Sequence, residues 1–235
     1  MSAPRVLLVE DDPSLQRFVE LALDGMTLEL RCCATVADAV ALLQNGRYAL
    51  IITDLLLPDG SGRDLLARLQ REPDLRGSAR CAVFSAGMDE PAKRAELLAL
   101  GAWRLLNKPC SLDELEGLVN EALQGSAAAA PAAASPAPNP VQSHFGGNET
   151  LYRAFRASCL QQFEHDLLTG DAACQTGDAP ALRRLAHSLK SVLLSLGHPA
   201  ESALAAALEL SAANGDWAQA RPQWQTLRQQ VQALH

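Results

Sequence analysis

The chain has 235 residues, of which 48% are hydrophobic and 4% aromatic, and its formal net charge is −7. This composition is typical of a globular protein long enough for two domains. Lys and Arg form no cluster, so we expect no nucleic-acid surface. Six cysteines lack C-x-x-C spacing and are interpreted as reduced thiols. Because no apolar run resembles a secretion signal or a membrane span, we expect a cytoplasmic protein without membrane contact.

A stretch rich in Ala, Pro and Ser divides the chain. Residues 125–143 carry no charge and few side chains that a core could bury. This composition is typical of a linker between domains. We therefore predict one domain over residues 1–124 and another over residues 144–235.

The first domain alternates short apolar runs with helical patterns. The runs that predict strands cover residues 5–9, 28–32, 49–53, 81–85 and 103–106. The helices between and after them are predicted to begin at Pro13, after Thr35, after Ser61, at Pro91 and after Ser111. Five such units predict an α/β domain, in which a doubly wound, five-stranded parallel sheet carries helices on both faces.

The second domain has helical patterns only. They cover residues 149–169, 179–196, 200–213 and 217–234. The connections between them contain Gly170, Gly177, Gly197 and Gly215. Four helices with short connections predict an all-α, antiparallel four-helix bundle.

Polar side chains follow the predicted strands of the first domain, at the sheet edge where α/β proteins place their functional groups. They are Glu10, Asp11, Asp12, Asp54, Ser85 and Lys108. Neighbouring carboxylates repel one another unless a cation lies among them, and oxygen ligands suit Mg²⁺. A carboxylate beside that ion could attack phosphorus, while an amine and a hydroxyl contact the phosphoryl oxygens. Each residue alone could be a cap, loop or surface residue, but their conjunction favours phosphoryl chemistry.

Residues 4–124 resemble the receiver domain of two-component response regulators. The motifs that carry the resemblance are VLLVEDD (6–12), TDLLLPDGSG (53–62), FSA (84–86), GAW (101–103) and NKP (107–109). The resemblance implies a flavodoxin-like fold with Asp54 as the phosphoacceptor. It implies Mg²⁺ ligation by Glu10, Asp11, Asp54 and the backbone carbonyl of Leu56. It also implies that Ser85 and Lys108 contact the phosphoryl group, and it leaves Asp12 as a helix-start residue.

One position departs from the receiver pattern. Receivers usually carry Tyr or Phe three residues before the lysine, and this sequence has Leu105 there. Trp103, two residues earlier, should point to the same side of the strand but lie farther from the site. The departure concerns the aromatic part of the conformational switch and leaves the phosphoryl chemistry unchanged.

His187 is the candidate nucleophile of the second domain. Helical periodicity places it away from the apolar stripe, on a face with Arg183, Lys190, Ser191 and Leu194. We therefore expect its imidazole to point to solvent, where a neutral ring is a competent nucleophile. Lys190 would stabilise a phosphoryl group, and Ser191 and Leu194 would serve partner docking. A lone histidine on such a helix is ordinarily a plain surface residue.

The surroundings of His187 resemble those of histidine-containing phosphotransfer (HPt) domains. The motif AHSLKS (186–191), the LG at 196–197 and the helix and turn over 201–216 carry the resemblance, which covers about residues 148–235. It implies that His187 carries a phosphoryl group and that Glu209 stands in the place expected for the family. Ser191 replaces the usual glycine, and Val192 replaces a small polar residue.

The leading interpretation is a phosphorelay protein. Asp54 would accept a phosphoryl group from a sensor histidine kinase, and His187 would exchange one with a receiver aspartate. That aspartate could be Asp54 or belong to a separate receiver or HPt protein. The chain would be a phosphoryl carrier rather than an enzyme. A phosphoester hydrolase is disfavoured, because Leu56 stands where such an enzyme needs a second acid.

The alternative is a binding switch, in which phosphorylation of Asp54 changes a protein-binding surface. The helical bundle would then be only a docking or dimerisation module. The departures at Ser191 and Val192 motivate this reading. Replacement of His187 by Gln separates the two, since it would stop a relay and leave a switch intact.

Overall fold

The computed structural model describes residues 3–87, 90–124 and 139–234. The chain divides into two compact units, one ending at residue 136 and the other beginning at residue 137. The first unit is α/β and the second is all-α, as predicted. Within the described ranges, no helix is both long and apolar enough to cross a membrane.

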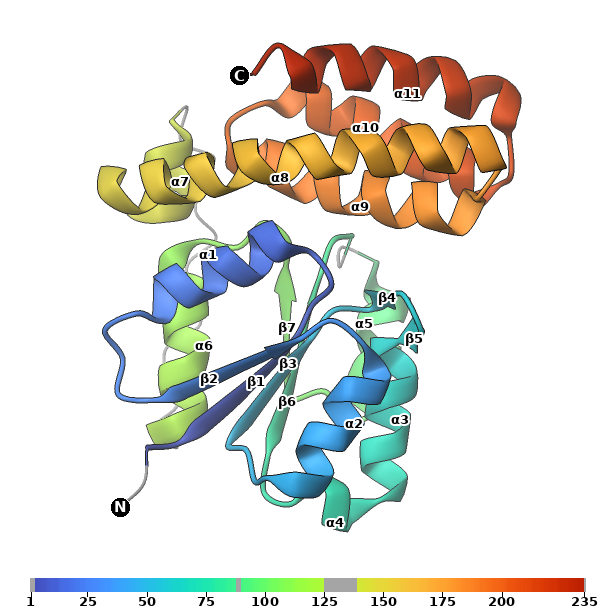
Figure 1. Ribbon diagram of the computed structural model, residues 1–235. Coiled ribbons are helices and arrows are strands. Elements are labelled where there is room, and N and C mark those ends of the chain that lie inside the picture. The colour runs from blue at the N-terminus through green and yellow to red at the C-terminus, as the bar shows by residue number, and fades with distance from the viewer. Residues whose placement is uncertain (1–2, 88–89, 125–138, 235) are drawn as a thin grey trace. The chain divides into compact units, whose positions relative to one another are not determined.

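A five-stranded sheet forms the centre of the first unit (Figure 1). Its strands, in spatial order, are β2 (Glu29–Cys33), β1 (Arg5–Val9), β3 (Leu50–Thr53), β6 (Arg80–Ser85) and β7 (Arg104–Asn107). Every pairing in this sheet is parallel. The central strands β1 and β3 are almost entirely buried, as expected for a sheet covered on both faces. The predicted doubly wound sheet is therefore confirmed, with strand ends shifted by one residue at most.

Helices cover both faces of this sheet. The helices α1 (Pro13–Leu23) and α6 (Leu112–Gln124) lie on one face. The other face carries α2 (Val36–Asn45), α3 (Gly62–Arg71) and α5 (Pro91–Ala99), with the short α4 (Pro73–Arg76) after α3. On this second face the leucines of the helices join the strand side chains in one buried cluster.

Side-chain caps fix the helix starts that the sequence predicted. The Asp12 carboxylate accepts hydrogen bonds from the backbone N–H groups of Ser14 and Leu15, at 2.7 and 3.2 Å. Ser111 and Glu114 form a reciprocal capping box: the Ser111 N–H donates to Glu114 at 2.8 Å, and the Glu114 N–H donates to the Ser111 hydroxyl at 3.2 Å. These bonds satisfy backbone donors that the first turn of a helix leaves without partners.

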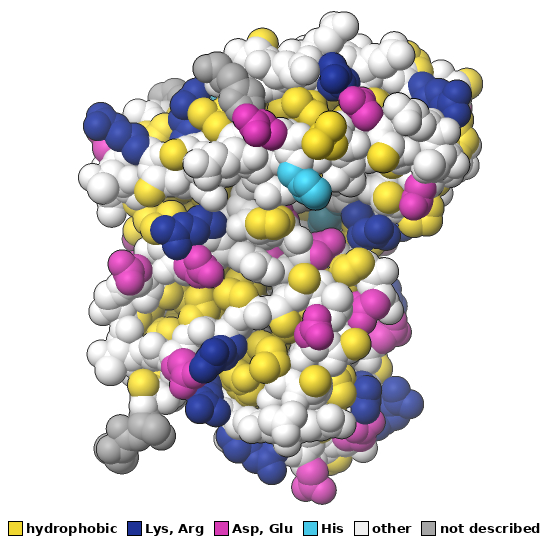
Figure 2. Space-filling model, in the orientation of Figure 1, with side chains coloured by type: hydrophobic (Ala, Val, Ile, Leu, Met, Phe, Trp, Pro, Cys, Tyr) yellow, Lys and Arg dark blue, Asp and Glu magenta, His cyan; other side chains and the backbone are white. Residues whose placement is uncertain are grey.

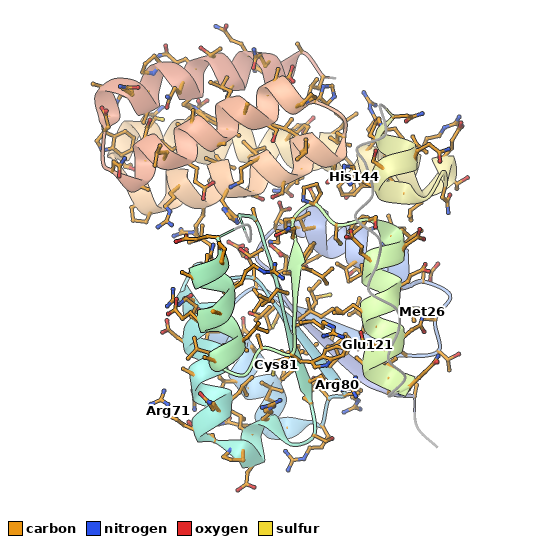
Figure 3. All side chains as sticks on the ribbon, turned by 180° about the vertical axis from the view of Figure 1, so that it is seen from behind. Met26, Arg71, Arg80, Cys81, Glu121 and His144 are labelled. Atoms are coloured by element: carbon orange, nitrogen blue, oxygen red, sulfur yellow. The ribbon has the colours of Figure 1, made fainter. Side chains whose placement is uncertain are left out.

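Trp103 is fixed at the end of the sheet opposite the carboxylates. Its ring lies 4.5 Å from the guanidinium of Arg80 and 5.1 Å from that of Arg104. Arg80 also donates to the backbone carbonyl of Glu121 at 2.8 Å, and Figure 3 shows these two residues together. Arg104 pairs with the Glu121 carboxylate at 2.7 Å. Trp103 is thus part of a cation–π cluster between β6, β7 and α6.

The second unit contains the helices α8 (Glu149–Thr176), α9 (Ala179–Ser195), α10 (Pro199–Ala213) and α11 (Trp217–Gln232). They form the predicted bundle, but the prediction that the first of them ends at Gly170 is wrong. Helix α8 continues to Thr176, so Gly170 lies inside the helix and faces α11. A Cβ atom at this position would be 2.1 Å from the Trp224 ring. The glycine therefore serves close packing of two helices rather than termination.

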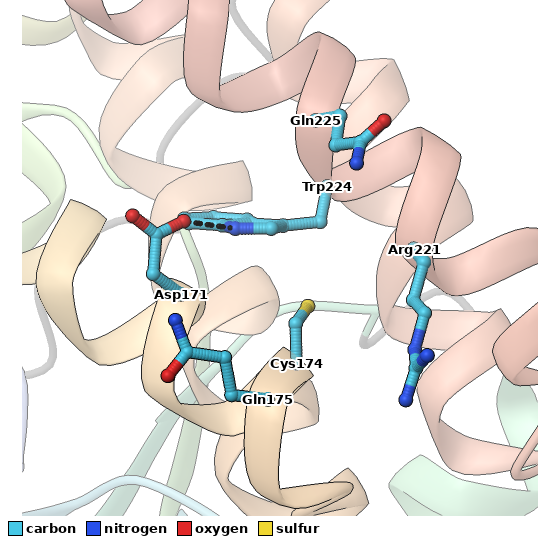
Figure 4. Close-up of a pocket in the computed structure, with 6 residues that line it drawn as sticks. All are labelled: Asp171, Cys174, Gln175, Arg221, Trp224 and Gln225. Atoms are coloured by element: carbon cyan, nitrogen blue, oxygen red, sulfur yellow. Dashed lines mark hydrogen bonds between the residues drawn. The ribbon is translucent and has the colours of Figure 1, made fainter.

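Asp171, the next residue of α8, holds α11 in place. It accepts hydrogen bonds from the Trp224 indole at 2.9 Å and from the Arg228 guanidinium at 3.0 Å. Figure 4 shows the Trp224 bond at the border of a pocket of about 300 Å³. The remaining lining residues are Cys174, Gln175, Arg221 and Gln225.

A short helix that the sequence did not predict, α7 (Pro140–Phe145), precedes the bundle. The Phe145 ring packs against Tyr152 and Phe155 of α8, with ring centroids 5.3 and 5.5 Å apart. A Cβ atom on Gly197 would lie 2.8 Å from Pro140. The last residues of the expected linker are therefore helical and belong to the second unit. The rest of that linker, residues 125–138, lies outside the described residues.

We predict that Gly170→Ala destabilises the helical unit by about 1–3 kcal/mol, because the added methyl group displaces Trp224. The measurement is denaturant unfolding followed by tryptophan fluorescence. Gly117→Ala in α6 is the control, since a Cβ atom there meets nothing within 4 Å. Helix propensity predicts that this control is neutral or stabilising. Equal midpoints for Gly170→Ala and the wild type would contradict the packing role.

Candidate functional site

Three carboxylates meet at the carboxyl edge of the sheet. Glu10 and Asp11 follow β1, Asp54 follows β3, and oxygen atoms of all three lie within 4.8 Å of one another. The Asp54 N–H donates to the Val9 carbonyl at 2.9 Å, which extends the pairing of the two strands to the site. The sequence predicted this convergence, because these residues directly follow predicted strands of a parallel sheet.

Lys108 lies among these acids. Its Nζ is 2.5 Å from Glu10 Oε2 and 3.0 Å from Asp54 Oδ2. Burial alone would lower the pKa of Lys108, but the charges of Asp54 and Glu10 outweigh it and raise the pKa above its usual range. Lys108 is therefore a permanent cation at the phosphoacceptor position that the sequence predicted.

The charges of this cluster fit a divalent cation. The cluster holds three carboxyl groups and one ammonium group, and burial raises the pKa of Glu10 well above its usual value. Burial, followed by the charges of Asp54 and Asp12, raises the pKa of Asp11 to about 6. An added cation beside these oxygens would remove that repulsion, and hard oxygen donors are the ligands that Mg²⁺ prefers. The acidic cluster is thus able to hold a metal ion.

The backbone around Asp54 is tightly fixed. Asp54 Oδ1 accepts from the Leu55 N–H at 2.6 Å, and the Thr53 hydroxyl donates to the Asp54 carbonyl at 2.9 Å. The Gly62 N–H donates to the Leu55 carbonyl at 3.2 Å. A Cβ atom on Gly62 would lie only 2.0 Å from the Asp54 carbonyl oxygen. Only glycine at position 62 allows the start of α3 to pass this close to the backbone of Asp54.

Asp12 and Gln16 support the acidic pair without joining it. Asp12 caps α1, which agrees with its expected role as a helix-start residue. Gln16 of α1 donates its side-chain amide to the Glu10 carbonyl at 2.5 Å. Sequence reasoning missed this contact, because a glutamine one turn into an amphipathic helix carries no distinguishing signal.

The remaining receiver positions lie as follows. Ser85 ends β6, buried, and its carbonyl accepts from the Lys108 N–H at 3.2 Å. Leu56 opens β4 (Leu56–Leu57), which pairs with β5 (Gly60–Ser61). The phosphoryl contact of Ser85 and the metal contact of the Leu56 carbonyl stay predictions.

Leu105 lies in β7 opposite Val83 and packs on the core. Since Trp103 is held by two arginines, it does not replace an aromatic residue at position 105.

In the helical unit, His187 forms a charged cluster with residues of α9 and α10. Its Nδ1 lies 2.8 Å from Glu209 Oε1, and Lys190 Nζ lies 2.5 Å from Glu209 Oε2. Burial alone would raise the pKa of Glu209, but His187 and Lys190 outweigh it and lower the pKa to about 2. Glu209 is therefore ionised at neutral pH. An ionised carboxylate only accepts hydrogen bonds, so Nδ1 is the ring nitrogen that carries a proton in this pair, and in the neutral ring Nε2 is the nitrogen with the lone pair.

The expectation that His187 points to open solvent is wrong. The side chain is 8% exposed, with the Glu209 carboxylate of α10 against its Nδ1. A periodic pattern describes one helix at a time, so it could not show the neighbouring helix. Ser191 has almost no exposed surface, whereas Leu194 is 37% exposed. The docking roles of both residues stay predictions.

Comparison with known families identifies both units. A model of the response regulator receiver domain matches residues 6–120. A model of the Hpt domain matches residues 152–235. The chain joins a receiver domain to an Hpt domain. Receiver and Hpt domains are both phosphotransfer modules.

Response regulators and isolated receiver domains are among the proteins similar to this chain. The response regulator protein PilR of Pseudomonas aeruginosa is 35% identical over 124 residues, which are 53% of this chain and 27% of PilR. The transcriptional regulatory protein PmrA of Pectobacterium parmentieri is 35% identical over 115 residues, or 49% of this chain and 50% of PmrA. The chain thus spans half or less of the length of these relatives. The receiver domain of a Syntrophus aciditrophicus histidine kinase is 26% identical, with 57% of this chain and all of that chain covered and a TM-score of 0.48.

We predict that Gly62→Ala lowers phosphorylation of the receiver by roughly tenfold or more, because its methyl group displaces the Asp54 backbone. Acetyl phosphate labelling followed by intact-mass spectrometry measures the effect. Gly60→Ala is the matched control, since its Cβ atom would make an ordinary contact of 3.5 Å with Val36. Labelling of Gly62→Ala at the wild-type rate would refute the close-packing argument.

The lowered pKa of Glu209 predicts a pH-dependent contribution to stability. The folded Hpt domain holds this carboxylate ionised down to about pH 2, whereas its ordinary pKa is 4.5. The ionised carboxylate therefore makes its full contribution to the free energy of unfolding above pH 4.5. That contribution is lost as the pH falls from 4.5 towards about 2. The free energy of unfolding of Glu209→Gln should be lower than that of the wild type at neutral pH, and the difference should shrink in acid. A difference that does not change with pH would count against the ion pairs.

Proposed function

We propose that this chain is a two-component phosphorelay protein and that Asp54 and His187 are its two phosphoryl-carrying residues. The observation that carries the proposal is that each lies beside a charge arrangement suited to its step. Asp54 is paired with Lys108 within a carboxylate cluster able to hold a cation. The Nδ1 of His187 is paired with an ionised carboxylate.

At Asp54, a carboxylate oxygen attacks the phosphorus of a phosphohistidine on a sensor histidine kinase. A P–O bond forms, the P–N bond breaks, and its electron pair returns to the departing imidazole nitrogen. Lys108 keeps its charge throughout and contacts the phosphoryl oxygens with Ser85. Mg²⁺ held by Glu10, Asp11, Asp54 and the Leu56 carbonyl would supply further neutralisation of those oxygens.

At His187, Nε2 is the nucleophile, because Glu209 holds the proton on Nδ1. It attacks the phosphorus of a receiver aspartyl phosphate, either that of Asp54 or that of a separate protein. The P–N bond forms, and the P–O bond breaks with its electron pair on the aspartate carboxylate. Lys190 shares the Glu209 carboxylate and lies one turn from His187, where it stabilises the transferred group. The positive charge of the phosphorylated ring faces Glu209.

The proposed partners are a sensor histidine kinase and a further receiver or HPt protein, in the cytoplasm. On the face that Figure 2 shows, basic and acidic side chains are interspersed over each unit, which suits protein partners better than a nucleic acid. No observation favours the alternative of a binding switch. The cluster of His187, Lys190 and Glu209 supports a relay role for the helical domain instead.

The test is phosphoryl mapping of the full chain. Wild type, Asp54→Asn and His187→Gln are incubated with Mg²⁺ and acetyl phosphate, and then with a phosphorylated kinase fragment. We expect an alkali-labile adduct that is absent from Asp54→Asn and an acid-labile adduct that is absent from His187→Gln. His165→Gln is the control, because that histidine lies on α8 outside the cluster and should leave both adducts unchanged. A chain whose His187 is never labelled by any receiver donor would overturn the relay and favour the switch.

A further inference from the structure

Asp59 forms an unusual link between two loops of the receiver domain. It lies at the tip of the hairpin of β4 and β5, next to Pro58. Its Oδ1 accepts from the Val36 N–H at 2.8 Å, and its Oδ2 accepts from the Ala37 N–H at 2.9 Å. A side chain from the hairpin therefore binds the first turn of α2, which is more than twenty residues away in sequence.

These bonds are favourable for a carboxylate. The first turn of α2 presents backbone N–H groups without helical partners and the positive end of the helix dipole. Burial alone would raise the pKa of Asp59, but the hydrogen bonds from Val36 and Ala37 lower it below its ordinary value. The α2 N-cap, Thr35, accepts from the Asp38 N–H, so Asp59 and Thr35 bind different donors of the same turn.

The hairpin that Asp59 anchors is part of the phosphoryl site. Asp54 and Leu55 lead directly into it, and Leu56 pairs with Ser61 across its base. The Gly62 N–H closes the loop on the Leu55 carbonyl at 3.2 Å. Any movement of the hairpin therefore displaces the Leu56 carbonyl, which is the proposed backbone ligand of the metal.

The start of α2 is in turn connected to the acidic pair. The Glu10 N–H donates to the carbonyl of Cys33, the last residue of β2, at 2.9 Å. Only Ala34 and Thr35 separate Cys33 from α2. Asp59 thus completes a ring of hydrogen bonds that joins the loop of Glu10 and Asp11 to the loop of Asp54 and Leu56.

We propose that Asp59 is a positioning residue for the metal site of the receiver domain. It holds the hairpin at the start of α2, so that the Leu56 carbonyl and the carboxylates of the other loop keep a common geometry. It touches neither metal nor phosphoryl group. This inference rests on the proposed function only in assigning Leu56 as a ligand.

The test compares Asp59→Ala, Asp59→Asn and Thr35→Ala in the full chain. Mg²⁺ affinity is measured by calorimetry, and exchange of the Val36 and Ala37 amide hydrogens is measured by NMR. We expect Asp59→Ala to weaken Mg²⁺ binding roughly tenfold and to speed both exchanges. Asp59→Asn, which keeps one acceptor oxygen, should be intermediate. Thr35→Ala weakens the same helix start without cutting the link to the hairpin, so its Mg²⁺ affinity should stay close to that of the wild type.

Phosphorylation supplies a second readout. At saturating Mg²⁺, Asp59→Ala should approach the wild-type rate of labelling by acetyl phosphate, since the defect lies in the affinity for the metal. Equal Mg²⁺ affinities for Asp59→Ala and Thr35→Ala would overturn the positioning role. If Asp59→Ala does not fold, the same comparison is made between Asp59→Asn and Thr35→Ala. Failure of the wild type to label at Asp54 would overturn the proposed function instead, while the metal affinities and amide exchange would still test Asp59.

Discussion

Like charges gathered at one edge of a sheet oppose folding, and Lys108 is the side chain that makes this gathering possible in the receiver domain. Its ammonium group lies between Glu10 and Asp54, at 2.5 and 3.0 Å. These pair interactions oppose the cost of burying the three groups, but burial still raises the pKa of Glu10 well above its usual value. Carboxyl groups outnumber the ammonium group in this cluster by two. A folded domain thereby keeps a local deficit of positive charge, which is what a site for a divalent cation requires.

The Hpt domain uses the opposite arrangement. One carboxylate, Glu209, lies between two groups that can carry positive charge, His187 and Lys190. The carboxylate accepts from one imidazole nitrogen through Oε1, and the lysine binds its other oxygen. The first domain thus places a cation among acids, around the carboxylate proposed as phosphoacceptor. The second places an acid between two bases, one of which is the histidine proposed as phosphoacceptor.

Close backbone packing occurs in both domains. Gly62 lets α3 start against the carbonyl of Asp54, and Asp59 ties the same loop to α2. In the helical domain, Gly170 lets the ring of Trp224 lie against α8, and Asp171 binds that ring and Arg228. In the receiver domain these contacts fix the loop of Asp54, and in the helical domain they fix α11 against α8.

The sequence by itself determined the five strands, the helix starts and the gathering of Glu10, Asp11, Asp54 and Lys108, because apolar runs, capping residues and the polar residues that follow each strand are local signals. The tertiary structure alone decided what lies against each residue. Helix α8 runs through Gly170, where the ring of Trp224 packs against it, and α10 brings Glu209 beside His187. Asp59 reads in sequence as an ordinary turn residue, and only folding brings it to the start of α2. Such contacts join residues far apart in the chain, and a periodic pattern carries no information about them.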